Sequence, residues 1–126
     1  MNAITPEFSP RKDIHDALWL DIGPVEQLPA LGARTLPVAG GREIAIFRTA
    51  TGEVYALINE CPHRKGPLSE GIVHDTTVTC PLHNWRISLK TGLAQGEDSG
   101  CVPVIPVKID NGRIFLSRAE ALQGLA

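Results

Sequence analysis

The stretch CPHRKGPLSEGIVHDTTVTCPLH, residues 61–83, contains the pattern that decides the fold. It opens with Cys61-Pro62-His63 and closes with Cys80-Pro81-Leu82-His83, so that each end offers one thiol and one imidazole. A zinc finger usually takes its two thiols from one arm and its two histidines from the other. Mixed pairs instead favour two facing loops around a two-iron cluster, with both cysteines on one iron and both histidines on the other. A structural zinc site and a vestigial site without metal are the alternatives.

The charge of such a cluster indicates what this ligand set does. Two thiolates neutralise the formal positive charge of two ferric ions and two sulfides, whereas four thiolates leave the site negative. Adding an electron to a neutral site costs less, so imidazole ligands raise the reduction potential above that of plant-type ferredoxins. The pattern therefore predicts one-electron transfer.

Short apolar runs with turn signals between them surround the two ligand pairs and predict an all-β protein of small antiparallel sheets. The expected strands are 34–38, 43–48, 54–58, 76–79, 85–89, 102–109 and 113–117, with short helical turns at 25–28 and 118–122. Gly40-Gly41, Thr51-Gly52 and Asn111-Gly112 mark turns, and an Asn-Gly pair between apolar runs is a strong hairpin signal. Pro103 and Pro106 confine their strand to an edge or an irregular stretch.

Length and composition limit the function. A chain of 126 residues has room for one domain, which we place at residues 17–126 with its cluster-binding part at about 59–93; residues 1–16 are expected to form an arm that is flexible or partner-bound. Twelve basic and fourteen acidic side chains leave a net charge of −2, which gives nucleic-acid binding no support. No apolar run reaches the length of about 18 residues that a membrane span needs, and the charged start does not resemble a signal peptide. We expect a cytoplasmic protein with no membrane or nucleic-acid partner.

The ligand pattern resembles the Rieske-type [2Fe–2S] proteins, and the resemblance extends from about Trp19 to Ser117. It implies a Rieske-like fold and one [2Fe–2S] cluster per chain, with Cys61 and Cys80 on one iron and His63 and His83 on the other. The Leu-Ser-x-Gly segment of the family lies at Leu68–Gly71. More narrowly, GREIAIFRTATGEVYAL, CPHRKGPLSEGIV and VTCPLHNWRI are similar to the small subunit of assimilatory NAD(P)H nitrite reductase.

The resemblance implies a non-catalytic electron-transfer subunit of an oxidoreductase that converts nitrite to ammonia. Its partner would be a large subunit carrying siroheme, an iron–sulfur centre and flavin. The alternative function is a free Rieske ferredoxin that feeds an aromatic-ring-hydroxylating oxygenase. Respiratory and photosynthetic Rieske proteins place Gly-Ser after the second histidine, and the serine hydroxyl donates to a bridging sulfide of the cluster. This chain has Asn84-Trp85 there, so that donor is missing and we predict a potential in the lower part of the Rieske range, below about 0 mV.

Residues other than the four predicted ligands are expected to have structural roles. Cys101 precedes an apolar run and is predicted to be buried, and His74 is predicted to lie solvated in a turn. Trp85 is expected to shield the second cluster loop, with a partner contact as the alternative. Arg64 and Lys65 form either a solvated pair or a basic contact for an acidic partner surface.

Overall fold

The computed structural model describes residues 19–38, 42–62, 66–81, 84–95 and 100–117. These residues form short strands and two 3-10 turns, with no α-helix among them. The strands are β1 (Trp19–Pro24), β2 (Ala33–Pro37), β3 (Glu43–Arg48), β4 (Val54–Ile58), β5 (Ile72–His74), β6 (Thr77–Thr79), β7 (Arg86–Ser88), β8 (Val104–Ile105), β9 (Val107–Asp110) and β10 (Arg113–Ser117); the turns are η1 (Val25–Gln27) and η3 (Leu68–Glu70). The all-β prediction is therefore confirmed.

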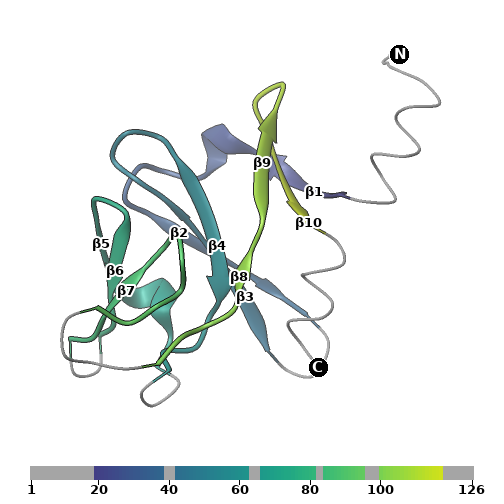
Figure 1. The fold of residues 1–126 in the computed structure, drawn as a ribbon. Helices are drawn as coiled ribbons and strands as arrows, with labels where there is room; N and C mark the ends of the chain where they lie inside the picture. The colour runs from purple at the N-terminus through teal and green to yellow at the C-terminus, as the bar shows by residue number, and fades with distance from the viewer. Residues whose placement is uncertain (1–18, 39–41, 63–65, 82–83, 96–99, 118–126) are drawn as a thin grey trace.

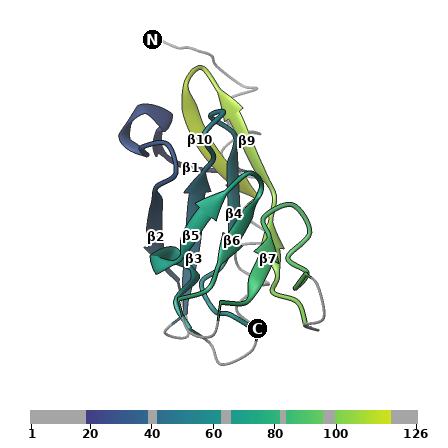
Figure 2. The same ribbon diagram turned by 90° about the vertical axis from the view of Figure 1, so that its left-hand side faces the viewer.

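Three antiparallel sheets organise these strands. Their orders are β1-β10-β9, β2-β3-β4-β8 and β5-β6-β7. The sheet β2-β3-β4-β8 lies between the other two, so that β5-β6-β7 and β1-β10-β9 occupy different ends of the molecule (Figure 1). Figure 2 shows the β9–β10 hairpin extending past the remaining strands. The predicted cluster-binding part, about 59–93, contains the small sheet β5-β6-β7.

The turn signals place the hairpins correctly where their residues are described. Asn111 and Gly112 join β9 to β10 with φ values of 52° and 74°, the left-handed conformation that a two-residue hairpin requires. β3, β4 and β10 have the predicted bounds. The predicted turn at Gly40-Gly41, the helical turn at 118–122 and the arm 1–16 lie outside the described residues.

The observed strands differ from the predicted ones in three places. The run 102–109 divides into β8 and β9 at Pro106, because proline has no N–H to donate to a ladder. β1 pairs along the whole of β10, although no strand is predicted there. β5 has only three residues, too few for a period of two to be recognised, and it takes His74 out of the expected turn and into the last position of a strand.

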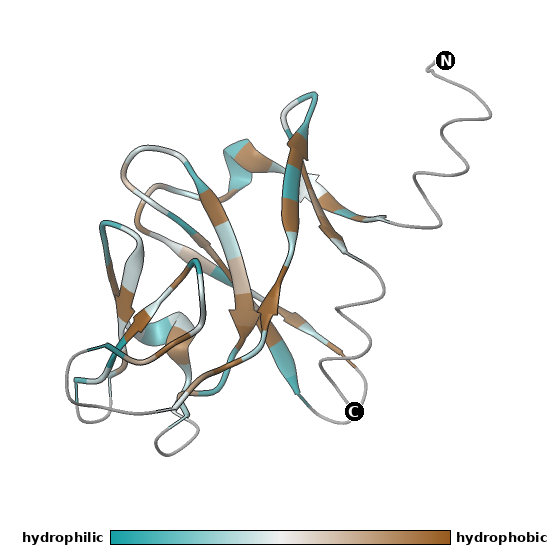
Figure 3. Cartoon of the chain, viewed as in Figure 1, coloured by the Kyte–Doolittle hydropathy of each residue, from teal (hydrophilic) through white to brown (hydrophobic). Residues whose placement is uncertain are grey.

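The core is centred on β3 and β4 and reaches the cluster-binding part. Four successive residues of β3, Ile44 to Phe47, are fully buried, so both faces of this strand are covered. Leu68, Val78 and Ile87 extend the same core into η3, β6 and β7. Figure 3 shows hydrophobic segments along the strands and hydrophilic ones at the hairpin turns. The described part of the chain contains no helix long and apolar enough to span a bilayer.

Candidate metal centre

Cys61 lies in the loop that leaves β4, and the core encloses it. Its side chain is 1% exposed and forms no disulfide. Its N–H donates to the carbonyl oxygen of Gly66 at 2.8 Å, so a backbone hydrogen bond joins Cys61 to the residue five positions further on. The position of Cys61 is therefore held by backbone hydrogen bonding as well as by its burial.

Cys80 follows β6 and is held in the same way. It is 2% exposed and free of disulfides, and its N–H donates to the carbonyl oxygen of Trp85 at 2.7 Å. In both loops the cysteine N–H thus bonds to the carbonyl five residues further on. Asn84 has a φ of 60°, the left-handed conformation that asparagine tolerates better than most residues, and it turns the chain back toward β7.

Gly71 allows the two loops to approach each other. A Cβ at this position would overlap the backbone carbonyl of Thr79, the residue before Cys80, and would lie 3.1 Å from Val78 Cγ2. The glycine of the Leu-Ser-x-Gly segment is thus required by close packing, since its own φ of −82° suits any residue. The exit of the first loop therefore packs directly on the entry of the second.

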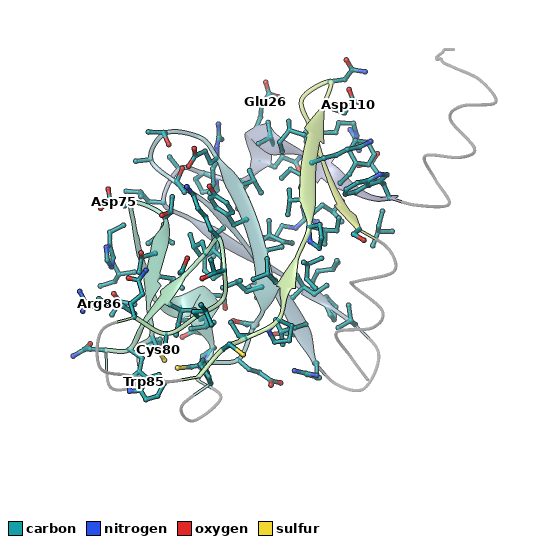
Figure 4. The ribbon with its side chains drawn as sticks, viewed as in Figure 1. Glu26, Asp75, Cys80, Trp85, Arg86 and Asp110 are labelled. Atoms are coloured by element: carbon teal, nitrogen blue, oxygen red, sulfur yellow. The ribbon has the colours of Figure 1, made fainter. Side chains whose placement is uncertain are left out.

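The segment that begins at Gly100 also contacts both loops. At Gly100, a Cβ would lie 3.1 Å from Pro62 Cβ and 3.8 Å from Trp85 Cζ3. Pro62 follows Cys61, and Trp85 accepts the hydrogen bond from Cys80, so the two loops meet at this point. Trp85 is half-buried and packs on the core, as expected of a residue that shields the second loop. Figure 4 shows Cys80 and Trp85 together, at the end of the molecule remote from Glu26 and Asp110.

The donor chemistry of these residues fits an iron–sulfur cluster. Two buried cysteines that form no disulfide lie in loops that pack on one another, and thiolate is the ligand that iron–sulfur clusters require. His63 and His83, the two predicted imidazole ligands, lie outside the described residues. Within the described residues no group of three or more His, Cys, Asp or Glu side chains could hold a metal ion. Of the four predicted ligands, only Cys61 and Cys80 are among those residues.

Comparison with known proteins decides the family. Residues 18–106 match the family model of the Rieske [2Fe–2S] domain. The chain belongs to the Rieske [2Fe–2S] family. Its cofactor is therefore a Rieske-type [2Fe–2S] cluster, a one-electron carrier when bound, and the predicted Rieske-like fold is confirmed.

Individual Rieske relatives point to two kinds of redox system. The chain is 38% identical over 108 residues to the 3-phenylpropionate/cinnamic acid dioxygenase ferredoxin subunit of Escherichia coli, covering 78% of this chain and 92% of that protein. It is 33% identical over 104 residues to a ferredoxin component of naphthalene 1,2-dioxygenase/salicylate 5-hydroxylase systems from a Ralstonia species, covering 78% and 93%. A solved structure from Mycobacterium tuberculosis, thought to be the small subunit of an NADH-dependent nitrite reductase, superposes with a TM-score of 0.71 at 27% identity, covering 80% of this chain and 95% of that one.

Cys101 lies beside the Rieske loops, and its predicted burial is wrong. The side chain is exposed and its thiol is free. Cys101 pairs with Leu93 in an isolated antiparallel bridge, and directly opposed residues in such a bridge point to the same side. Leu93 is 54% exposed, so this side faces solvent, whereas the next residue, Val102, is 4% exposed and points inward.

Two described side chains near the Rieske loops, His74 and Arg42, have identifiable polar partners. His74 is exposed, as predicted, and its Nε2 lies 2.9 Å from Thr79 Oγ1. Arg64 and Lys65 lie outside the described residues. Arg42 donates through Nε and Nη2 to both carboxylate oxygens of Glu60, at 3.3 and 3.2 Å, immediately before the first cysteine.

Asn59 is a Rieske-loop residue that sequence reasoning missed. It is 7% exposed, and its side chain bonds to Ser69 and Glu43. A polar residue two positions before Cys61 reads as an ordinary loop residue in the sequence. Only its burial distinguishes it, and burial here depends on contacts with residues distant in the chain.

Proposed function

We propose that Cys61 and Cys80 bind one iron of the Rieske cluster and that His63 and His83 bind the other. The two buried cysteines and the contact between their loops support the cysteine half of this assignment. The spacing of the ligand pairs supports the histidine half. In this arrangement the cysteine side faces the core, and electrons pass through the imidazole edge.

The variant His83→Ala tests the ligand assignment directly. It should lose the rhombic electron paramagnetic resonance signal of a reduced Rieske cluster, because one iron loses an imidazole ligand. The described strands should remain folded, as measured by far-ultraviolet circular dichroism, since the substitution leaves the apolar side chains of their core in place. Survival of the Rieske signal in this variant would show that the ligand set is wrong.

The function that we propose is the small electron-transfer subunit of an assimilatory NAD(P)H-dependent nitrite reductase. The observation that carries it is the similarity of both cluster loops and of the β3–β4 hairpin to that subunit. Loops adjacent to a redox centre meet the partner protein, whereas identity spread over a whole domain reflects the shared fold. The M. tuberculosis structure, similar over 95% of its length, supports the same function.

In this role the chain carries electrons and leaves the chemistry of nitrite to its partner. The partner would be the large subunit with siroheme, iron–sulfur and flavin groups, and the complex would be cytoplasmic. Nothing in the sequence resembles a Ser/His/Asp or paired-carboxylate site, so hydrolysis has no support. The electrons would enter or leave by the His63 and His83 edge of the cluster.

A ferredoxin component of an aromatic-ring-hydroxylating oxygenase is the second candidate. The E. coli and Ralstonia ferredoxins favour it, because the chain is 33–38% identical to them over 92–93% of their lengths. Both candidate functions use the same cluster and differ in the protein that exchanges electrons with it.

Deletion of the gene in its host distinguishes the two functions. Loss of growth on nitrite as sole nitrogen source, restored by the wild-type gene but not by one encoding Cys80→Ser, is the result expected for the nitrite reductase subunit. The tagged chain should then co-purify with a large siroheme-containing protein. Normal growth on nitrite, together with loss of growth on an aromatic acid, would refute this function and establish the ferredoxin.

A further inference from the structure

The first cluster loop is held at its ends differently from the second. The second loop connects β6 to β7, and Thr79 and Arg86 at its two ends are paired in the β6–β7 ladder. The first loop connects β4 to η3, and β4 pairs only with β3 and β8 among the described strands. The ends of the first loop therefore lack the ladder that fixes the second.

A pair of side chains takes the place of that ladder. Asn59, before the loop, accepts a hydrogen bond from the backbone N–H of Ser69 at its Oδ1, at 2.8 Å. The Nδ2 group of Asn59 donates to Ser69 Oγ at 3.0 Å. Two parallel bonds thus join the residue that precedes Cys61 by two positions to the middle residue of η3. We call this pair the Asn59–Ser69 clamp.

The clamp is anchored to the central sheet. The backbone N–H of Asn59 donates to the carbonyl oxygen of Glu43 at 2.8 Å, and Nδ2 also donates to Glu43 Oε1 at 3.2 Å. Every hydrogen-bonding group of the Asn59 amide therefore has a partner. Because Asn59 is 7% exposed, water cannot replace these bonds without reopening the site.

We propose that Asn59 is a positioning residue of the Rieske site: through Ser69 it fixes the span of the first cluster loop, and thereby the retention and reduction potential of the cluster. The loop between the clamped ends contains Cys61 and His63. Outer hydrogen bonds of this kind hold metal ligands at their working geometry, and their loss typically lowers metal affinity about 10- to 100-fold. The proposal depends on the Rieske cluster and is independent of the redox partner.

The test uses the cluster-loaded protein, purified without oxygen. Iron release to a coloured ferrous chelator is followed for the wild type, Asn59→Ala, Ser69→Ala and Ser69→Thr. Midpoint potentials and the electron paramagnetic resonance of the reduced proteins are measured on the same samples. We expect Asn59→Ala to release iron at least about tenfold faster than the wild type and to shift the potential and the g values. Ser69→Ala, which loses only the Oγ bond, should show a smaller change in the same direction, and Ser69→Thr should restore wild-type values.

Matched controls separate positioning from general stability. Ile114→Val and Leu116→Ala remove buried methyl groups from β10, in the sheet at the other end of the molecule, and destabilise the fold by small and large amounts. Together they define how iron release depends on unfolding free energy alone. Asn59→Ala should release iron faster than this dependence predicts, while the potentials of both control variants stay at the wild-type value.

Two results would overturn the proposal. One is iron release from Asn59→Ala at the rate that its stability alone predicts, and the other is an unchanged potential and spectrum. If Asn59→Ala takes up no cluster at all, the iron release of Ser69→Ala relative to its stability, together with its potential and spectrum, decides whether the proposal holds.

Discussion

Gly92 packs against the segment that begins at Gly100, and its substitution offers a sharp test of the packing around the two cysteine loops. Gly92 has a φ of 77°, and its N–H donates to the carbonyl oxygen of Ser88 at 2.8 Å. Its own carbonyl accepts the N–H of Val102 at 2.9 Å. A Cβ at Gly92 would overlap the carbonyl oxygen of Val102 and lie 2.9 Å from Val104 Cγ2. Alanine should therefore be strongly unfavourable here.

Gly112 provides the matched control. It has nearly the same φ, 74°, but a Cβ there would meet nothing within 4 Å. Alanine costs about 1–2 kcal/mol in the left-handed conformation at either position. The restriction that alanine imposes on the unfolded chain is also the same. These contributions cancel in the comparison of Gly92→Ala with Gly112→Ala, which leaves only the steric overlap.

The overlap can be relieved only by moving the 102–104 backbone. That movement weakens the bond between Val102 and Gly92, at about 1 kcal/mol, and disturbs buried packing, at about 1–3 kcal/mol. We therefore expect Gly92→Ala to be about 2–4 kcal/mol less stable than Gly112→Ala. With a urea dependence of about 2 kcal/mol per molar, its unfolding midpoint should lie roughly 1–2 M lower.

The assay is urea unfolding of both cluster-loaded variants, followed by far-ultraviolet circular dichroism and by the visible absorption of the cluster. The cluster signal should be lost at the lower midpoint too, since Gly92 supports the segment that reaches Pro62 and Trp85 through Gly100. Equal midpoints for the two variants would refute the reasoning, because they would mean that the backbone at Val102 yields without cost.

Three further predictions concern groups elsewhere in the chain. The pKa of Tyr55 is raised above its usual value of 10.0, first by burial and then by the charge and the hydrogen bond of Glu53. Because the folded chain holds the phenol proton more tightly than the unfolded chain, Tyr55 stabilises the fold below pH 10.0, and this contribution is lost as the pH rises through the raised pKa. Tyr55 is the only tyrosine, so its tyrosinate absorbance can be titrated alone, and Glu53→Gln should lower its midpoint; an unchanged midpoint would exclude Glu53 as a cause. In the cluster-loaded native protein, Cys101 should be the one cysteine that reacts with a thiol reagent, because it is exposed. Cys61 and Cys80 should react only after the cluster is removed and the chain is unfolded. Three reactive thiols in the loaded protein would contradict the assignment of Cys61 and Cys80 as ligands. Protein-film voltammetry should give a midpoint potential below about 0 mV, and a value well above this would mean that the Asn84-Trp85 sequence does not lower the potential.

The sequence reveals those features of the site that depend on residues close together in the chain. Two Cys/His pairs indicate a cluster because their ligand chemistry and spacing are readable without a structure. The β3–β4 and β9–β10 hairpins follow from apolar runs and turn residues only a few positions apart. Asn111-Gly112 dictates a left-handed turn through the conformational freedom of the two residues themselves.

The prediction fails where a residue's environment comes from distant segments. Cys101 is exposed because it is paired with Leu93 on the solvent side of a bridge, a relation that the apolar run after it does not reveal. β5 is too short to show a period, and it forms because β6 supplies its partner. β1 forms against β10, almost a hundred residues later.

The sequence by itself thus determines the cluster chemistry and the all-β class, because ligand type, turn propensity and apolar runs act over a few neighbouring residues. The tertiary structure alone decides that Asn59 is buried against Ser69 and Glu43, and that Gly71 and Gly92 must be glycine to admit the carbonyls of Thr79 and Val102. These contacts join segments 10 or more residues apart, or pack one backbone directly against another. Such contacts arise only when the sheets assemble, since burial and steric exclusion are properties of the folded chain as a whole.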